Sequence, residues 1–198
     1  KLDNPEQARN CYESILELDD ADLKAFASLR ELYRSAQLWP DLRELDEEFV
    51  HRVSDSERYD VLVEIRDVLV DRLSEQDLGF IAGCRVYREE PSSLAAADIL
   101  EKIALTIDSA EEAAAVLEDE NERVEDGAIR VQLLLQIGRL YAEEVQDTPA
   151  AEDVYQRVLS LDESNHRALD MLSRLAAGED RFDKQLAALE KKILVVDD

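Results

Sequence analysis

Few side chains in this sequence could act as nucleophiles, catalytic bases or soft metal ligands. Its 198 residues include two histidines, His51 and His166, and two cysteines, Cys11 and Cys84. No C-x-x-C, H-E-x-x-H, G-x-S-x-G or glycine-rich phosphate motif occurs. We expect both histidines at the surface or at a groove edge, and both cysteines in helix packing. The sequence therefore predicts no enzyme activity, no bound metal and no cofactor.

An acidic stretch from Glu118 to Gly127 is the one segment with a composition that calcium could favour. It lacks the D-x-D-x-D-G spacing and the closing glutamate of an EF-hand loop. Runs of charge are usually exposed to solvent. We interpret this stretch as a solvated linker between two helix pairs.

Acidic residues dominate the charge, because 48 Asp and Glu stand against 23 Lys and Arg, a formal net charge of −25. Such a field repels nucleic acids and anionic membranes. No apolar run approaches the roughly 20 residues of a membrane-spanning helix, and no signal peptide is visible. We expect a cytoplasmic chain that binds no nucleic acid and inserts into no membrane. Its richness in acids, alanine and arginine is typical of high-GC or salt-tolerant bacteria.

The elements that position these side chains repeat along the sequence. Seven positions recur at a constant offset of 72 residues: Leu62, Ile65, Leu69, Pro91, Ala96, Leu100 and Ile103 match Leu134, Ile137, Tyr141, Glu163, Ala168, Leu172 and Leu175. Six N-terminal positions match the last copy at an offset of 143: Ala8, Tyr12, Leu16, Ala25, Leu29 and Leu32 match Ala151, Tyr155, Leu159, Ala168, Leu172 and Leu175. The sequence predicts a repeat array, with a partial unit 1–54 and units 55–126 and 127–198.

Apolar residues three and four apart place one apolar stripe on each predicted helix. The four prolines, together with Gly127 and Gly178, fall at the expected helix ends. Together they predict about eleven helices, near 5–18, 22–36, 39–52, 56–73, 75–89, 93–106, 110–121, 128–145, 149–161, 165–177 and 181–195. Gly79 and Gly83 fall inside one of these helices.

The spacing Leu134-x2-Ile137-Gly138-x2-Tyr141, followed by Ala151-x3-Tyr155, resembles the tetratricopeptide repeat, with one extra residue placed at the Thr148–Pro149 turn. The resemblance implies an all-α, right-handed solenoid of tandem antiparallel helix hairpins. Gly79 occupies the position of Ala151, which suits close packing. Gly83 replaces Tyr155 and leaves space for Phe80 or Tyr87.

Residues 3–18 align with the second helix of a hairpin, so we expect a segment excised from a longer array. Its first helix should then expose apolar side chains such as Ile15 and Leu18. Self-association through this end is one expected consequence. Trp39, at a helix start beside Pro40, is expected to pack on the preceding helix.

The resemblance also implies that the first helix of each hairpin lines a concave groove. The charged groove residues it indicates are Lys24, Glu31, Arg34, Asp60, Asp67, Asp98, Lys102, Arg139, Arg167 and Arg174. The neutral positions of the same line are Ala27, Val63, Val70, Ala95, Gln132 and Leu135, with Asp170 on the last helix.

Three arginines make the C-terminal part of this line basic, whereas aspartates make its middle acidic. An extended partner would place its acids beside Arg139, Arg167 and Arg174. Alternatively, Arg139 and Arg174 pair with Glu143 and Asp170 on their own helices. The Lys and Asn of chaperone-binding members are absent, so a chaperone C-terminus is not the expected ligand.

Two classes of function fit these observations. The first is a non-catalytic scaffold that binds a peptide or protein partner in the groove. The second is a structural spacer or regulatory segment of a larger multidomain enzyme or signalling protein. A scaffold binds its partner in isolation, whereas a spacer binds nothing.

Overall fold

The computed structural model describes residues 4–178, and these form helices joined by short turns. The chain divides into two compact units, Lys1–Glu89 and Glu90–Asp198, which we call unit 1 and unit 2. The division falls between the two hairpins of the predicted repeat 55–126. Spatial units and sequence repeats are different divisions, so the three repeat boundaries stay a prediction.

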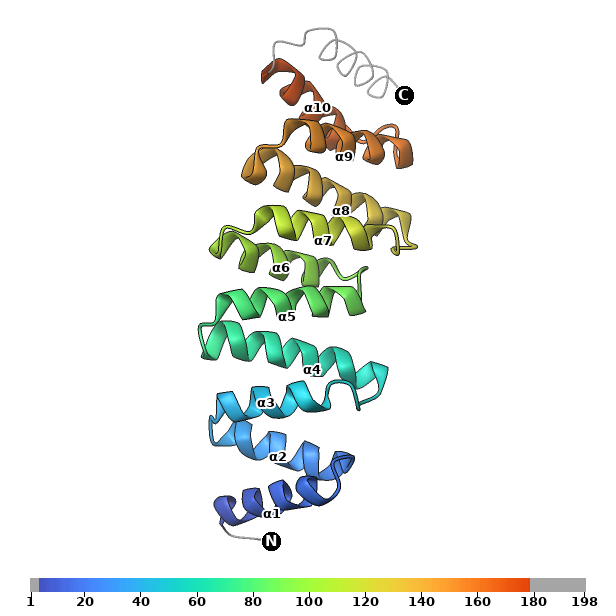
Figure 1. Cartoon of the computed structure of the whole chain (residues 1–198). Coiled ribbons are helices and arrows are strands. Elements are labelled where there is room, and N and C mark those ends of the chain that lie inside the picture. The colour runs from blue at the N-terminus through green and yellow to red at the C-terminus, as the bar shows by residue number, and fades with distance from the viewer. Residues whose placement is uncertain (1–3, 179–198) are drawn as a thin grey trace. The chain divides into compact units, whose positions relative to one another are not determined.

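Unit 1 contains five of the described helices (Figure 1). They are α1 (Pro5–Leu18), α2 (Leu23–Ser35), α3 (Trp39–Phe49), α4 (Asp55–Asp67) and α5 (Gln76–Glu89). A π-helical segment, η1 (Val68–Arg72), continues α4. Each helix packs on the next one along the chain.

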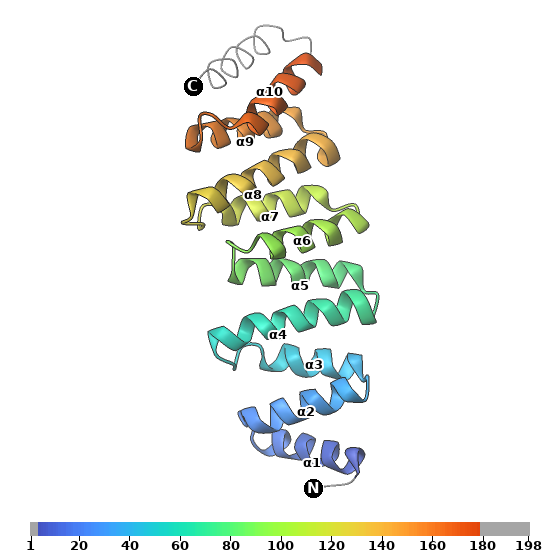
Figure 2. The same ribbon diagram turned by 180° about the vertical axis from the view of Figure 1, so that it is seen from behind.

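Unit 2 repeats this arrangement (Figure 2). Its described helices are α6 (Leu94–Thr106), α7 (Ala110–Asn121), α8 (Gly127–Arg139), α9 (Thr148–Leu161) and α10 (His166–Gly178). A second π-helical segment, η2 (Leu140–Val145), continues α8.

Consecutive helices run back and forth within each unit, which makes antiparallel pairs (Figures 1 and 2). The complete hairpins among the described residues are α2–α3, α4–α5, α6–α7 and α8–α9. The all-α, tetratricopeptide-like fold expected from the repeat is confirmed. When η1 is counted with α4 and η2 with α8, the bounds of the ten described helices lie within three residues of the predicted ones; the predicted helix 181–195 lies outside the described residues.

Each complete hairpin turns through one residue with a left-handed backbone. These residues are Gln37, Ser74, Asp108 and Gln146, with φ between 56° and 60°. Glycine is the usual residue at such helix ends because it has no Cβ penalty there. All four positions therefore carry a small conformational cost.

The two π-helical segments begin at Val68 and Leu140, which are 72 residues apart. A π turn holds one residue more than an α turn. The extra residue relative to the tetratricopeptide spacing is therefore absorbed at the end of α8. Its predicted place in the Thr148–Pro149 turn was wrong, since these residues already begin α9.

The repeated apolar positions form the interior. Leu62 and Leu134, like Ile65 and Ile137, are at most 2% exposed. Close packing on the α8–α9 hairpin requires a glycine, since a Cβ on Gly138 would lie 2.8 Å from the Tyr155 ring. A Cβ on Gly79 would lie 2.5 Å from Val70 Cγ2.

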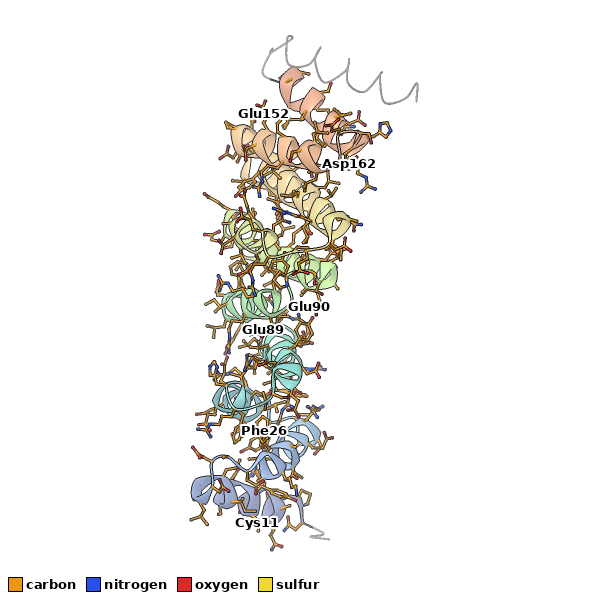
Figure 3. All side chains as sticks on the ribbon, turned by 90° about the vertical axis from the view of Figure 1, so that its right-hand side faces the viewer. Cys11, Phe26, Glu89, Glu90, Glu152 and Asp162 are labelled. Atoms are coloured by element: carbon orange, nitrogen blue, oxygen red, sulfur yellow. The ribbon has the colours of Figure 1, made fainter. Side chains whose placement is uncertain are left out.

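Other packing predictions had mixed outcomes. Cys84 is buried as predicted, but Cys11 is exposed on the outside of α1, where Figure 3 labels it. The prediction for Cys11 was wrong because α1 buries no residue completely. Tyr87, one of two aromatic residues expected beside Gly83, is fully buried. Ile15 and Leu18 are exposed as expected.

The predicted acidic linker was wrong for its first four residues. Glu118 to Asn121 form the last turn of α7, and Asn121 is fully buried. The Asn121 amide nitrogen donates to the Arg130 carbonyl at 3.3 Å, which ties α7 to α8. The start of the acidic stretch is therefore not a solvated linker, because it packs in the contact between α7 and α8.

Candidate functional site

The first helices of unit 2 enclose a groove of about 930 Å³. We call it the unit-2 groove. It is lined by Leu94, Asp98, Glu101, Lys102, Gln132, Leu135, Gln136, Arg139, Glu143, Tyr155, Arg167, Asp170, Met171 and Arg174. Apolar side chains from α6, α8 and α10 are interleaved with charged ones, and Tyr155 contributes from α9.

A hydrogen-bonded network joins α6 and α8 within this groove. Glu101, only 9% exposed, forms an ion pair with Arg139. Its other oxygen, Oε2, accepts a hydrogen bond from Gln136 Nε2 at 2.6 Å. Burial lowers the pKa of Arg139, but the bond to Glu101 and the attraction of Glu101, Glu143 and Glu144 together outweigh it, and the pKa is raised overall. Arg139 therefore stays protonated, and its positive charge is already paired with Glu101 of the same chain.

This network decides between the two interpretations of Arg139. The ion-pair interpretation is correct for it, with Glu101 as the nearer partner and Glu143 3.9 Å away. Sequence reasoning missed Glu101, although it lies three residues after Asp98 on the same helix and so faces the same side.

Arg167 and Arg174 lie on α10 in a different environment. Both are exposed and line the groove, seven residues apart on one helix face. Within residues 4–178 no carboxylate forms an ion pair with either of them. The expected pairing of Arg174 with Asp170 is not formed. The guanidinium groups of Arg167 and Arg174 can therefore donate hydrogen bonds to carboxylates of another molecule.

Unit 1 holds a second groove, of about 550 Å³, which we call the unit-1 groove. It is lined by Arg30, Arg34, Trp39, Asp60, Val63, Glu64, Asp67, Val68, Asp71 and Arg72. Its arginines are engaged: Arg30 and Arg34 both pair with Glu64. The Arg72 guanidinium lies 5.1 Å from the centre of the Trp39 ring. Trp39 is half-buried and borders this groove.

Asp46 is fully buried and contacts Arg30, one of the residues that line the unit-1 groove. Arg30 Nε is 2.7 Å from its Oδ1. Burial raises the pKa of Asp46 to about 7, against the attraction of Arg30 and with the help of Glu64. This carboxyl therefore titrates near neutral pH.

The structure gathers eight of the ten charged groove residues indicated by the sequence. Arg34, Asp60 and Asp67 line the unit-1 groove. Asp98, Lys102, Arg139, Arg167 and Arg174 line the unit-2 groove. Lys24 and Glu31 are exposed on α2 and line neither groove. That any of them binds a partner stays a prediction.

The residues with catalytic potential remain dispersed. His51 and His166 are exposed on different units, as expected. Burial raises the pKa of the Cys84 thiol, which disfavours the reactive thiolate. Within the described residues, no three His, Cys, Asp or Glu side chains are placed to hold a metal ion. No helix of residues 4–178 is long and apolar enough to cross a membrane.

No protein-family model and no curated protein matches this chain. Solved structures that are similar to it include MamA, at 13% identity and a TM-score of 0.49, covering 87% of this chain and 90% of MamA. YrrB, a TPR protein with an unusual peptide-binding site, has 15% identity and a TM-score of 0.48, with 94% and 93% covered. BtubC from P. vanneervenii has 14% identity and a TM-score of 0.47, with 96% and 87% covered. The fold assignment rests on the helix pairing of this chain itself.

Proposed function

We propose that this chain is a non-catalytic scaffold whose unit-2 groove binds a peptide segment of a partner protein. The observation that carries the proposal is the pair of exposed arginines, Arg167 and Arg174, beside an apolar groove floor. The charge of an arginine is satisfied when a carboxylate of the same chain pairs with it. No carboxylate of the described residues pairs with Arg167 or Arg174.

The groove has the size and lining of a recognition site. Its volume of about 930 Å³ lies in the upper part of the range of roughly 300–1,000 Å³ for ligand sites. Leu94, Leu135 and Met171 supply apolar contact, and methionine adapts easily to different side chains. The bound segment would place apolar side chains on this floor.

Charge sets the orientation of the segment. Arg167 and Arg174 lie about 10 Å apart along α10, at 1.5 Å for each of seven residues. Acidic side chains of the partner would lie against α10. The Glu101–Arg139–Gln136 network would act as a fixed wall between α6 and α8, since its charges are already compensated.

A selection from a displayed library of random dodecapeptides tests this proposal. The variant Arg167→Gln/Arg174→Gln removes two positive charges from the groove. The matched control, Ala115→Glu/Gln156→Glu, makes the same change in net charge at exposed positions of α7 and α9 outside the groove.

The parent and the control should enrich acidic peptides, and the groove variant should bind them at least about tenfold more weakly for each arginine, as charge-assisted hydrogen bonds contribute about 1.5–3 kcal/mol. Equal binding by all three proteins would place the site elsewhere. No enrichment by any of them would favour the spacer function.

A further inference from the structure

The second helices of unit 1 border a separate cavity, of about 330 Å³, that the sequence pattern did not indicate. We call it the acidic notch. It is lined by Glu13, Leu16, Glu17, Leu29, Tyr33, Asp41, Glu44, Leu45 and Glu48. These residues come from α1, α2 and α3, and none of them lines the unit-1 groove.

The notch has an apolar floor. Leu29, Tyr33 and Leu45 are between 2% and 8% exposed, and Leu16 is half-buried. Three of the carboxylates, Asp41, Glu44 and Glu48, project from one face of α3 at helical spacing. The rim is therefore acidic on the α3 side and on the α1 side, with hydrocarbon between.

The negative charge of the rim is largely uncompensated. The described part of the chain contributes five carboxylates and no Lys, Arg or His to the lining. Within residues 4–178 no cation pairs with Glu17, Glu44 or Glu48. Among the contacts that the described residues make with these five carboxylates, only Glu13 is engaged: it accepts a hydrogen bond from the Tyr33 hydroxyl at 2.8 Å and lies 3.5 Å from Arg9 Nε.

The phenol of Tyr33 reports the same field. Its pKa is raised by burial, by the hydrogen bond to Glu13 and by the charges of Glu13 and Asp41. A cation entering the notch would lower the electrostatic energy of all these groups.

The shape of the notch selects among cations. No three of its carboxylates are placed to converge on one metal ion. Lysine and arginine instead carry a charged head on an apolar stem of several carbons. The stem could lie on Leu16, Leu29 and Leu45 while the head reaches the carboxylates.

We propose that the acidic notch docks a basic segment of a partner protein, which inserts a lysine or arginine side chain between α1 and α3. The net charge of −25 would attract such a segment at long range. This site uses different helices and the opposite charge from the unit-2 groove, so it stands independently of the function proposed above.

The test titrates the 15N-labelled 198-residue chain with the peptide acetyl-Leu-Arg-Leu-Leu-Arg-Leu-amide and follows backbone amide shifts. The notch variant is Glu17→Gln/Glu44→Gln/Glu48→Gln. Because any basic peptide is drawn to an acidic protein, the control removes the same charge elsewhere, as Asp119→Asn/Glu122→Gln/Glu125→Gln. Those three residues are exposed and line none of the described cavities.

We expect amide shifts on residues 13–17, 29–33 and 41–48, an affinity at least about tenfold weaker for the notch variant, and less than a twofold change for the control. The peptide with glutamine in place of arginine should not bind. Equal weakening by both variants, or shifts confined to the unit-1 groove, would overturn the proposal. So would concentration-dependent dimers of the parent that the notch variant abolishes, because a second copy would then fill the notch.

Discussion

Hairpins α4–α5 and α8–α9 share one register but place the large side chain on opposite helices. In α8–α9 the first helix carries Gly138 and the second carries Tyr155, whose ring occupies the space beside the glycine. The equivalent residues of α4–α5 are Arg66 and Gly83, both buried. The first helix is therefore the bulky one in unit 1 and the small one in unit 2.

A second exchange follows the same rule. Val70 faces Gly79 in α4–α5, whereas the equivalent residues of α8–α9 are Ala142 and Ala151. From α4–α5 to α8–α9 the first helix loses two side-chain carbons and the second gains one, so the loss is offset in part. The comparison teaches that at these two helix contacts a larger side chain on one helix is matched by a smaller one on the other, while the residue type on either helix varies.

The groove faces of the same hairpins differ in charge. Asp60 and Asp67 of α4 correspond to Gln132 and Arg139 of α8, and both pairs line a groove. Packing does not constrain charge at an exposed position. The buried residues therefore maintain the fold, while the charges that line the grooves can differ between the two hairpins.

The largest effect should come from removing the ring that fills α8–α9. Tyr155→Ala should lower the free energy of unfolding by about 3–5 kcal/mol, because a large buried side chain leaves a cavity. Tyr155→Phe keeps the ring and should cost less than about 1.5 kcal/mol. Urea unfolding measures both, and a small effect of the alanine variant would refute the packing role.

The two units also differ at the position of Asp46. Asp46 is a buried carboxyl in unit 1, whereas the equivalent Glu118 of unit 2 is partly exposed and pairs with Arg157. The pKa of Asp46, about 7, lies above its unfolded value, so the native state retains a proton that the unfolded state releases. Stability from this group is complete at low pH and is lost as the pH rises from about 4 to 7, by up to about 1.4 kcal/mol per pH unit.

Asp46→Asn should flatten that slope. Thermal unfolding at half-unit pH steps measures it. A slope unchanged by the substitution would show that Asp46 remains ionised beside Arg30.

Exchanging the packing of the two hairpins tests the volume rule directly. Gly83→Tyr alone should destabilise by about 1–3 kcal/mol through overpacking. Adding Arg66→Gly recreates the α8–α9 arrangement and should recover at least about 1 kcal/mol relative to the sum of the single changes. Strict additivity in this double-mutant cycle would mean that the two positions do not share space.

The contact between Val70 and Gly79 allows a second test of the same kind, with a smaller expected effect. Gly79→Ala should destabilise by about 1 kcal/mol, since the new Cβ would lie 2.5 Å from Val70 Cγ2 while alanine favours the helix. Val70→Ala should relieve the clash in the double variant, which then matches Ala142 and Ala151. Chemical unfolding of the three variants decides whether the relief occurs.

The smallest effect concerns the equivalent left-handed turns. Ser74→Gly and Gln146→Gly should each stabilise by no more than about 1 kcal/mol, because glycine adopts positive φ without strain. Similar shifts in melting temperature are expected for the pair. Opposite signs would indicate that the two turns are not equivalent.

The fold followed from the sequence because apolar spacing and the 72-residue offset record helix packing directly. Groove positions such as Arg167 and Asp60 followed from the resemblance to the tetratricopeptide repeat. Other features did not, because they depend on contacts between helices: the pairing of Arg139 with Glu101, the burial of Asp46 and the acidic notch between α1 and α3. The π-helical segments were missed because one added residue leaves the apolar stripe almost unchanged.

Hydrogen exchange with mass spectrometric detection, with and without an acidic peptide recovered from the library selection, tests the central claim that the unit-2 groove is the binding surface. The account predicts slower exchange in residues 94–106, 127–139 and 166–178, and no change in residues 23–35 or 55–67. Slower exchange confined to unit 1, or none anywhere at saturating peptide, would contradict it.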